Sequence, residues 1–126
     1  MIAGIGVDLV KVDRIARSLE RYGERFARKI LAPGELTAWR CSKTPAMLLA
    51  KRFAAKEAVA KALGTGVRGG VHFPQITITH RKSGAPEVIL SGKAENRAVF
   101  LGVTETHISI SDEDEYVVAF VTMECN

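Results

Sequence analysis

Length and composition favour one globular domain over residues 1–126, because this length closes a single hydrophobic core. The 47% apolar and 25% charged residues are unlike the composition of disordered or fibrous chains. The 18 Lys and Arg exceed the 14 Asp and Glu, and the net charge of +4 favours an anionic partner: nucleic acid, a membrane surface, a phosphorylated small molecule or an acidic protein.

Two features predict a cytoplasmic protein. Cys41 and Cys125 have neither metal-ligand nor redox spacing, which argues against a disulfide framework and for a reducing compartment. The apolar stretch 1–10 is too short to span a bilayer, and it lacks the basic segment and cleavage site of a secretory signal.

The first elements are a strand and a long helix. Residues 2–10 alternate as a strand, with Asp8 on the same face as two glycines, Gly4 and Gly6. From Asp13, a suitable N-cap, the spacing is helical to about residue 31, and Gly23 is a candidate break.

The remaining pattern predicts an α+β fold with a mostly antiparallel sheet. A short helix is expected at 35–41 and a strong one, rich in Ala, Leu and Lys, at 46–63, closed by Gly64. Strand-like runs and a further helix follow, and because strands and helices do not alternate strictly, a doubly wound parallel sheet is disfavoured. The expected ranges are strands at 75–80, 87–91, 107–111 and 116–123 and a helix at 93–101.

The long helix places charged residues where a simple amphipathic helix would not. Arg52 and Lys56 fall within the apolar arc, so either they extend from the edge of the core or they line a cleft that accepts anions. Glu57 and Lys61 lie four residues apart on a neighbouring face, beside an alanine-rich side that another backbone can approach closely. An exposed ion pair is the plain interpretation of that spacing.

Asp8 gives Glu57 a second interpretation. Two carboxylates without a His or Cys cluster suit a hard cation such as Mg²⁺, which takes one or two acidic ligands, water and phosphate oxygens. The alternative for Asp8 is a strand residue that bonds local backbone. The glycines at 64–70 follow a helix, whereas a phosphate-binding P-loop precedes one, so we reject a P-loop.

Five arginines fall within a narrow arc of the first predicted helix, and such a run is usually a solvated face. The absence of Lys from this arc instead favours bidentate pairing with carboxylates or phosphates, as on an acidic protein helix. The arginines of this arc are Arg14, Arg17, Arg21, Arg25 and Arg28.

His107 shares a strand face with Ser109 and Ser111, where a structural, hydrogen-bonded role is the plain interpretation.

Four blocks, in order along the whole chain, resemble the holo-acyl-carrier-protein synthases, the small bacterial 4′-phosphopantetheinyl transferases. The block around Lys56 and Glu57 is highly specific, and the others are weak alone. Residue 85 is Ala where that family usually has Lys, and Asp112 stands where many members have His, so neither receives a role. The blocks are Gly6 to Val10, Lys51 to Ala58, Lys61 to Gly66 and His107 to Ser111.

The resemblance implies a 4′-phosphopantetheinyl transferase-like fold and a magnesium enzyme of fatty acid biosynthesis. Its members move the phosphopantetheine of coenzyme A to a serine of apo acyl carrier protein and release adenosine 3′,5′-bisphosphate. It implies Asp8 and Glu57 as metal ligands, Lys61 on the coenzyme phosphates, and Arg52 and His107 near the coenzyme.

The resemblance also implies a homotrimer with active sites at subunit boundaries. The arginine face, Arg14, Arg17, Arg21 and Arg25, would dock the acidic carrier protein. The rival interpretations are a basic nucleic-acid-binding module and a purely structural trimer. Aromatics are only 6% of the chain and none lies on the arginine face, so stacking platforms for single-stranded nucleic acid are missing there. Neither nucleic acid nor a membrane is an expected partner.

Overall fold

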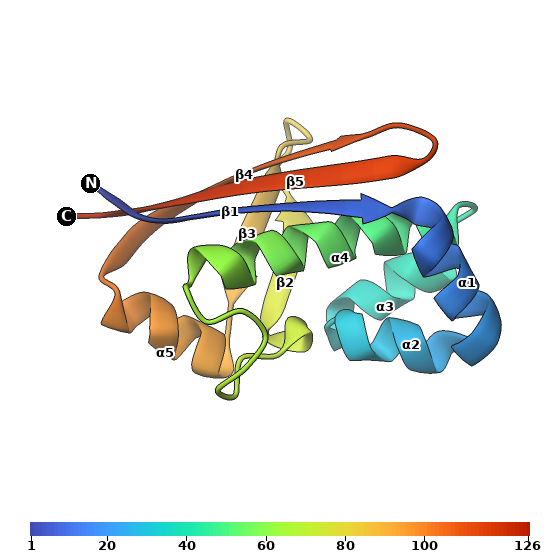
Figure 1. Ribbon diagram of the computed structural model, residues 1–126, viewed down its shortest axis with the longest axis horizontal. Helices are drawn as coiled ribbons and strands as arrows, with labels where there is room; N and C mark the ends of the chain where they lie inside the picture. Colours follow the sequence, from blue (N-terminus) through green and yellow to red (C-terminus); the bar gives the residue numbers. More distant parts are fainter.

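The computed structural model describes residues 1–126, arranged as two antiparallel sheets and five α-helices (Figure 1). This arrangement confirms the predicted α+β class. In chain order the elements are β1 (Ile2–Lys11), α1 (Val12–Tyr22), α2 (Glu24–Ile30), α3 (Pro33–Arg40), α4 (Pro45–Ala62), the 3-10 turn η1 (Phe73–Gln75), β2 (Ile76–His80), β3 (Pro86–Leu90), α5 (Gly92–Phe100), β4 (Val103–Asp112) and β5 (Tyr116–Cys125).

The larger sheet has the strand order β1-β5-β4, and every neighbouring pair is antiparallel. The first and last strands of the chain therefore lie side by side, and the two termini meet at one end of the molecule (Figure 1). β2 and β3 form a separate hairpin, as predicted.

Helix α4 lies against the inner face of the larger sheet and forms the centre of the core (Figure 1). It begins with Pro45 in its first turn, where a missing backbone N–H costs nothing, and it ends before Gly64, whose φ of 79° suits glycine. The side chains of Val117, Val121 and Met123 of β5 lie on this inner face and are fully buried. The predicted long central helix is thus confirmed.

The predicted helix over 13–31 is two helices. Gly23 has φ 63° and separates α1 from α2, and its N–H donates to the carbonyl of Leu19 at 2.7 Å. The expectation that Asp13 caps the helix is wrong: Lys11 is the cap residue, and Asp13 lies in the first turn, where it pairs with Arg17 at 2.9 Å.

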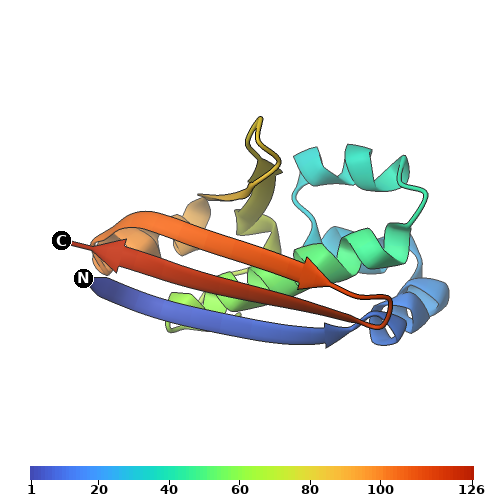
Figure 2. The same ribbon diagram turned by 90° about the horizontal axis from the view of Figure 1, so that it is seen from above.

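The outer face of the larger sheet is covered by no other element (Figure 2). Successive residues of a strand point to opposite faces of the sheet, so the residues next to the buried ones point outward, and many of these outward side chains are apolar. Those more than 40% exposed are Ile2, Ile5, Val7, Leu9, Tyr116 and Phe120.

Candidate functional site

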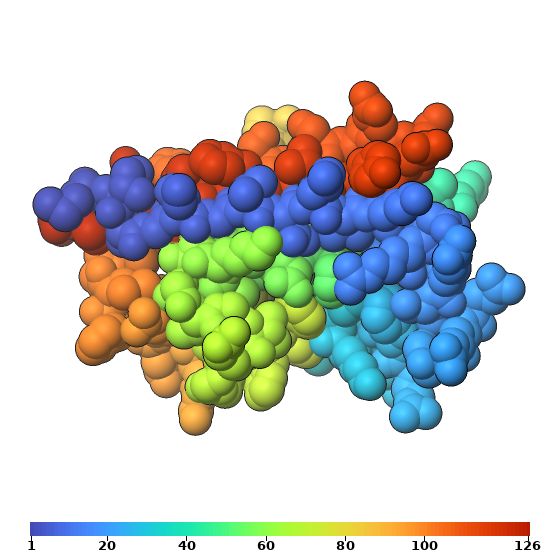
Figure 3. Space-filling view, in the orientation of Figure 1, coloured from blue at the N-terminus to red at the C-terminus, as the bar shows by residue number.

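The two glycines of β1 allow the strand to touch α4 directly. A Cβ built on Gly4 would lie 1.9 Å from the carbonyl oxygen of Ala62, and one on Gly6 would lie 1.9 Å from that of Ala58. Any side chain at either position would therefore push the strand away from the helix. The N-terminal strand runs along the helix in direct contact with it (Figure 3).

Asp8 follows these glycines on the same inward face of β1, so the close contact sets its position over α4. The ammonium of Lys61 donates to Asp8 Oδ1 at 3.1 Å and to the carbonyl of Val7 at 2.9 Å. Asp8 is largely shielded, with 16% of its side chain exposed, whereas that of Lys61 is 49% exposed. Lys61 therefore holds the carboxylate while still facing solvent.

Glu57 lies one helical turn before Lys61 and senses the charge of Asp8. Burial raises the pKa of Glu57, the negative charge of Asp8 raises it further, and Lys61 and Arg14 oppose the rise. Two carboxylates that repel each other in a partly shielded position form a favourable site for a cation. The structure thus brings together Asp8, Glu57 and Lys61.

A polar hollow of about 590 Å³ adjoins this cluster at the C-terminal end of α4. Lys61 and Arg68 supply positive charge to a wall otherwise made of Thr65 and glycines. Such a lining can hold an anion through both cations and the backbone amides of the loop. Sequence reasoning gave Arg68 no role, because nothing in the glycine-rich loop indicates which way its side chain lies.

Arg52 and Lys56 lie away from Asp8, on another side of α4, and both approach Glu35. Lys56 is completely buried and donates to Glu35 Oε1, to the carbonyl of Ile30 at 2.7 Å and to that of Phe73 at 3.3 Å. These three bonds satisfy the whole ammonium group. Lys56 therefore neither extends from the core edge nor lines an anion cleft, which are the two alternatives that its position in the apolar arc suggested.

Glu35 is the buried carboxylate that sequence reasoning missed. Oε1 also accepts the backbone N–H of Ala32, and Oε2 accepts that of Ile78 at 3.1 Å. Arg52 Nε lies 3.6 Å from Oε2, at the wall of a cavity of about 260 Å³. Two features of the sequence could have indicated Glu35. It lies two residues after Pro33, in the first turn of a helix, and the two cations in the apolar arc, Arg52 and Lys56, had no acidic partner assigned.

Arg52 and Lys51 place positive charge close to His80. Burial lowers the pKa of His80, and the charges of Arg52 and Lys51 lower it further. Arg52 itself is only 14% exposed at its side chain. This end of α4 is therefore a second cationic region, separate from Lys61 and Arg68.

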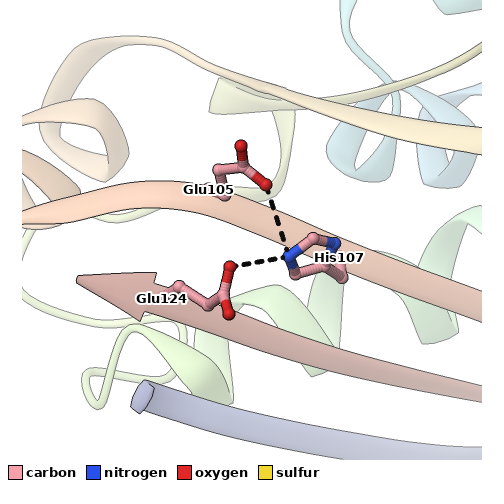
Figure 4. Close-up of side chains that lie close together, drawn as sticks. All are labelled: Glu105, His107 and Glu124. Atoms are coloured by element: carbon pink, nitrogen blue, oxygen red, sulfur yellow. Dashed lines mark hydrogen bonds and ion pairs between the residues drawn. The ribbon is translucent and has the colours of Figure 1, made fainter. Parts of the chain in front are cut away.

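His107 lies on the opposite face of the sheet from Asp8. It is paired with Thr122 on β5, while Asp8 is paired with Ala119, and alternation turns the two side chains to the outer and inner faces. The imidazole contacts Glu124 at 3.1 Å and Glu105 at 3.5 Å (Figure 4). Within one chain, His107 is not part of the cluster around Asp8.

The predicted arginine face is interrupted at Gly23 and its members differ in their contacts. Arg14 lies 5.9 Å from the ring of Phe53 and close enough to Glu57 to lower its pKa, and Arg21 stacks on Tyr22. Arg17 pairs with Asp13 and Arg28 with Glu24. Arg25 lines a hollow of about 330 Å³ together with Tyr22, Phe26 and Lys29.

No helix of the described chain is both long and apolar enough to cross a membrane. A model of the family described as the 4′-phosphopantetheinyl transferase superfamily matches residues 4–121. The chain is 54% identical over 123 residues to the holo-[acyl-carrier-protein] synthase of Halorhodospira halophila, and this match covers 98% of each chain.

Solved structures agree with the sequence comparison. The holo-[acyl-carrier-protein] synthase of Neisseria meningitidis superposes with a TM-score of 0.93 at 44% identity, over 98% of this chain and 99% of the other. The Bacillus anthracis synthase, solved in complex with CoA (3′,5′-ADP), gives a TM-score of 0.84 at 34% identity, over 100% of this chain and 99% of the other.

Proposed function

The chain belongs to the 4′-phosphopantetheinyl transferase superfamily, which confirms the resemblance, and we propose that its 126 residues form one holo-acyl-carrier-protein synthase domain. It transfers the 4′-phosphopantetheine group of coenzyme A to a serine of apo acyl carrier protein, in fatty acid biosynthesis. The observation that carries this proposal is the convergence of Asp8, Glu57 and Lys61 beside a hollow lined by cations.

The donor set fits Mg²⁺. Asp8 and Glu57 offer hard carboxylate oxygens. The pKa of Glu57 is raised first by burial and then by repulsion from Asp8, and a divalent cation would relieve that repulsion. These two residues would hold the ion. When bound, Mg²⁺ would stabilise the negative charge that develops on the phosphate under attack and on the leaving group.

The transfer forms one bond and breaks one. The serine oxygen of the carrier protein bonds to the phosphorus that bears pantetheine, and the bond from that phosphorus to the bridging oxygen breaks, which releases adenosine 3′,5′-bisphosphate. Glu57, directly or through water, accepts the serine proton, a role that suits its raised pKa. Lys61, with half of its side chain exposed, neutralises the phosphates and can protonate the leaving oxygen.

Arg52, Lys61 and His107 are proposed to bind the coenzyme, with two subunits contributing to each site. His107 and the exposed apolar residues lie on the same outer sheet face. Association through that face would bury Val7 and Phe120 and bring His107 of one subunit towards the cleft of another. We therefore propose a homotrimer, and a cytoplasmic location that suits the free thiols of Cys41 and Cys125.

The basic surface of α1 and α2 is the proposed docking site for the acidic carrier protein. Arg14 links this surface to the reaction centre, because it lies close to Glu57. A carrier helix seated on Arg17, Arg21 and Arg25 would deliver its serine towards that carboxylate.

Mass spectrometry of an apo acyl carrier protein tests the function directly. Mixed with this protein, coenzyme A and Mg²⁺, the carrier should gain the mass of one phosphopantetheine group, and the gain should stop when its acceptor serine is replaced by Ala. A carrier whose mass stays unchanged, in the presence of folded protein, would disprove the proposed activity.

A further inference from the structure

We propose that Arg97 of α5 is a positioning residue for coenzyme A, because it caps the end of α4 and holds the glycine-rich loop 64–70 in place. This inference deepens the proposed transferase function and rests on it. Most of the loop lines the polar hollow beside Lys61, and α5 lies next to both the loop and the end of α4 (Figure 1). Arg97 itself does not line the hollow, so it acts through the loop.

The end of α4 needs partners for its last carbonyl groups, which have none within the helix. The N–H of Gly66 turns back to the carbonyl of Ala60 at 3.0 Å. Arg97 Nε donates to the carbonyl of Leu63, the cap residue of the helix, at 2.9 Å. Its positive charge also suits the negative end of the helix dipole. Arg97 therefore fixes the residue from which the glycine-rich loop begins.

Two neighbours lie against the guanidinium of Arg97. The ring of Phe100, further along α5, has its centre 5.3 Å from the guanidinium carbon. A Cβ built on Gly64 would lie 3.4 Å from Arg97 Nη2, so the first residue of the loop passes close to the guanidinium. Gly64 also lines the hollow. A shift of Arg97 would therefore change one wall of the hollow.

Gln75 fastens the far end of the loop to the same helix. Its Nε2 donates to the carbonyl of Gly70 at 3.0 Å, and its Oε1 accepts the N–H of Ala94 in α5 at 3.1 Å. Glycine permits many backbone conformations, so the glycine-rich segment 65–69 gains its order from attachments at its two ends. Helix α5 thus holds the loop through Arg97 at its start and Gln75 at its end.

The hollow binds an anion only as well as its wall is ordered. Lys61, Arg68 and the loop surround a space of about 590 Å³, and coenzyme A is a polyanion that would occupy it through phosphate oxygens. Loss of the cap would let the loop move, and the cost of ordering it again would weaken binding. Asp8 and Glu57 lie on β1 and on α4, before the cap, so the chemical step should not change.

Arg97→Met tests this role, with Arg97→Lys as the conservative variant that keeps a charged donor. Titration calorimetry with coenzyme A and Mg²⁺ should show binding roughly fivefold weaker in Arg97→Met, the loss that corresponds to one ordinary hydrogen bond, and Arg97→Lys should recover most of it. Steady-state kinetics should show a matching rise in KM for coenzyme A, with kcat and the KM for the carrier unchanged. Partial unfolding would instead lower kcat and leave both KM values unchanged. Asn96→Met, at an exposed neighbour on α5, is the matched control.

Amide hydrogen exchange reports the order of the loop without any transfer. The N–H groups of Gly64 and Gly66 should exchange faster in Arg97→Met than in the wild type or in Arg97→Lys. A wild type that binds coenzyme A but does not transfer its phosphopantetheine would disprove the proposed function and leave this inference standing. Coenzyme A binding that is absent from the wild type, or unchanged in Arg97→Met, would overturn the inference. A binding defect that vanishes at high ionic strength would also overturn it, since salt screens a charge that acts only at a distance.

Discussion

Gly6 shows how a single missing side chain positions the proposed site. Its Cα faces the carbonyl oxygen of Ala58, and a Cβ there would lie 1.9 Å from that oxygen, far inside van der Waals contact. Because both partners are backbone atoms of regular elements, neither can turn aside as a flexible side chain would. The separation of β1 and α4, and with it the position of Asp8 relative to Glu57, therefore depends on this glycine.

We predict that Gly6→Ala lowers the free energy of unfolding by at least about 2 kcal/mol, because the added carbon overpacks a strand–helix contact that cannot relax. Thermal or denaturant unfolding measures the loss. Gly34→Ala is the matched control, since nothing lies within 4 Å of a Cβ built there. Equal stability of Gly6→Ala and Gly34→Ala would show that the strand does not need the glycine.

Lys56 stabilises the packing of α3 on α4 through its buried ion pair with Glu35. Lys56→Met should destabilise the fold by about 3–5 kcal/mol, because it removes the direct ion pair of buried Glu35 and leaves only the more distant Arg52 as a counter-ion. The double variant Glu35→Gln/Lys56→Met should recover much of this loss, since it removes both charges. Denaturant unfolding of the wild type, Glu35→Gln, Lys56→Met and the double variant gives the coupling free energy. Purely additive losses would contradict the ion pair that ties α3 to α4.

At the scale of elements, α1 and α2 present the proposed carrier-binding surface. Gly23 turns the chain between them, so Arg21 lies at the end of one helix and Arg25 near the start of the next. Arg17 and Arg28 already pair with acidic neighbours on their own helices. Arg21 and Arg25 are therefore the members best able to meet carboxylates of another protein.

We predict that Arg21→Glu raises KM for the carrier protein roughly fivefold and leaves KM for coenzyme A nearly unchanged. Loss and reversal of one exposed charge interaction corresponds to about 1 kcal/mol, and the effect should shrink as salt screens it. Steady-state kinetics at two ionic strengths measures both constants. Lys82→Glu, the same charge change on the β2–β3 turn, is the control, and an equal rise for both substrates would argue against docking.

Elements were more predictable than the contacts between them. Local patterns sufficed for the strand at Asp8, the long helix, the β2–β3 hairpin and the break at Gly23, because alternation, helix-favouring residues and glycine act within a few residues. The partner of Lys56 was not predictable in this way. Glu35 is 21 residues earlier in the chain, and only packing of α3 on α4 brings the two together. Likewise, only the strand register reveals that Glu124 meets Glu105.

At the scale of the whole molecule, the uncovered outer sheet face predicts association. Single exposed apolar side chains are ordinary, but here Ile5, Val7, Leu9 and Phe120 lie on adjoining strands of one face. His107 shares that face, whereas Asp8 lies beneath the sheet. Association would therefore bury the apolar surface and complete the proposed coenzyme site, of which one chain would hold only a part.

We predict that Phe120→Glu converts the proposed trimer to a monomer, because association would bury an unpaired charge. Light scattering after size-exclusion chromatography measures the mass. Phe100→Glu, at an even more exposed apolar residue on α5, should remain trimeric. A wild-type protein that is monomeric at assay concentrations, or a Phe100→Glu variant that dissociates as readily, would contradict association through this face.

We propose that Asp8 and Glu57 together hold the divalent ion on which transfer depends. Electron paramagnetic resonance of Mn²⁺ in the presence of coenzyme A measures the binding of this ion and tests the proposal most directly, since Mn²⁺ replaces Mg²⁺ at oxygen ligands. Glu105→Gln supplies the background, so that the carboxylates beside His107 do not compete for the ion. Asp8→Asn and Glu57→Gln should each weaken Mn²⁺ binding at least about tenfold and abolish transfer while the protein stays folded, whereas Glu20→Gln should do neither. Full Mn²⁺ binding and transfer in either carboxylate variant would contradict the account.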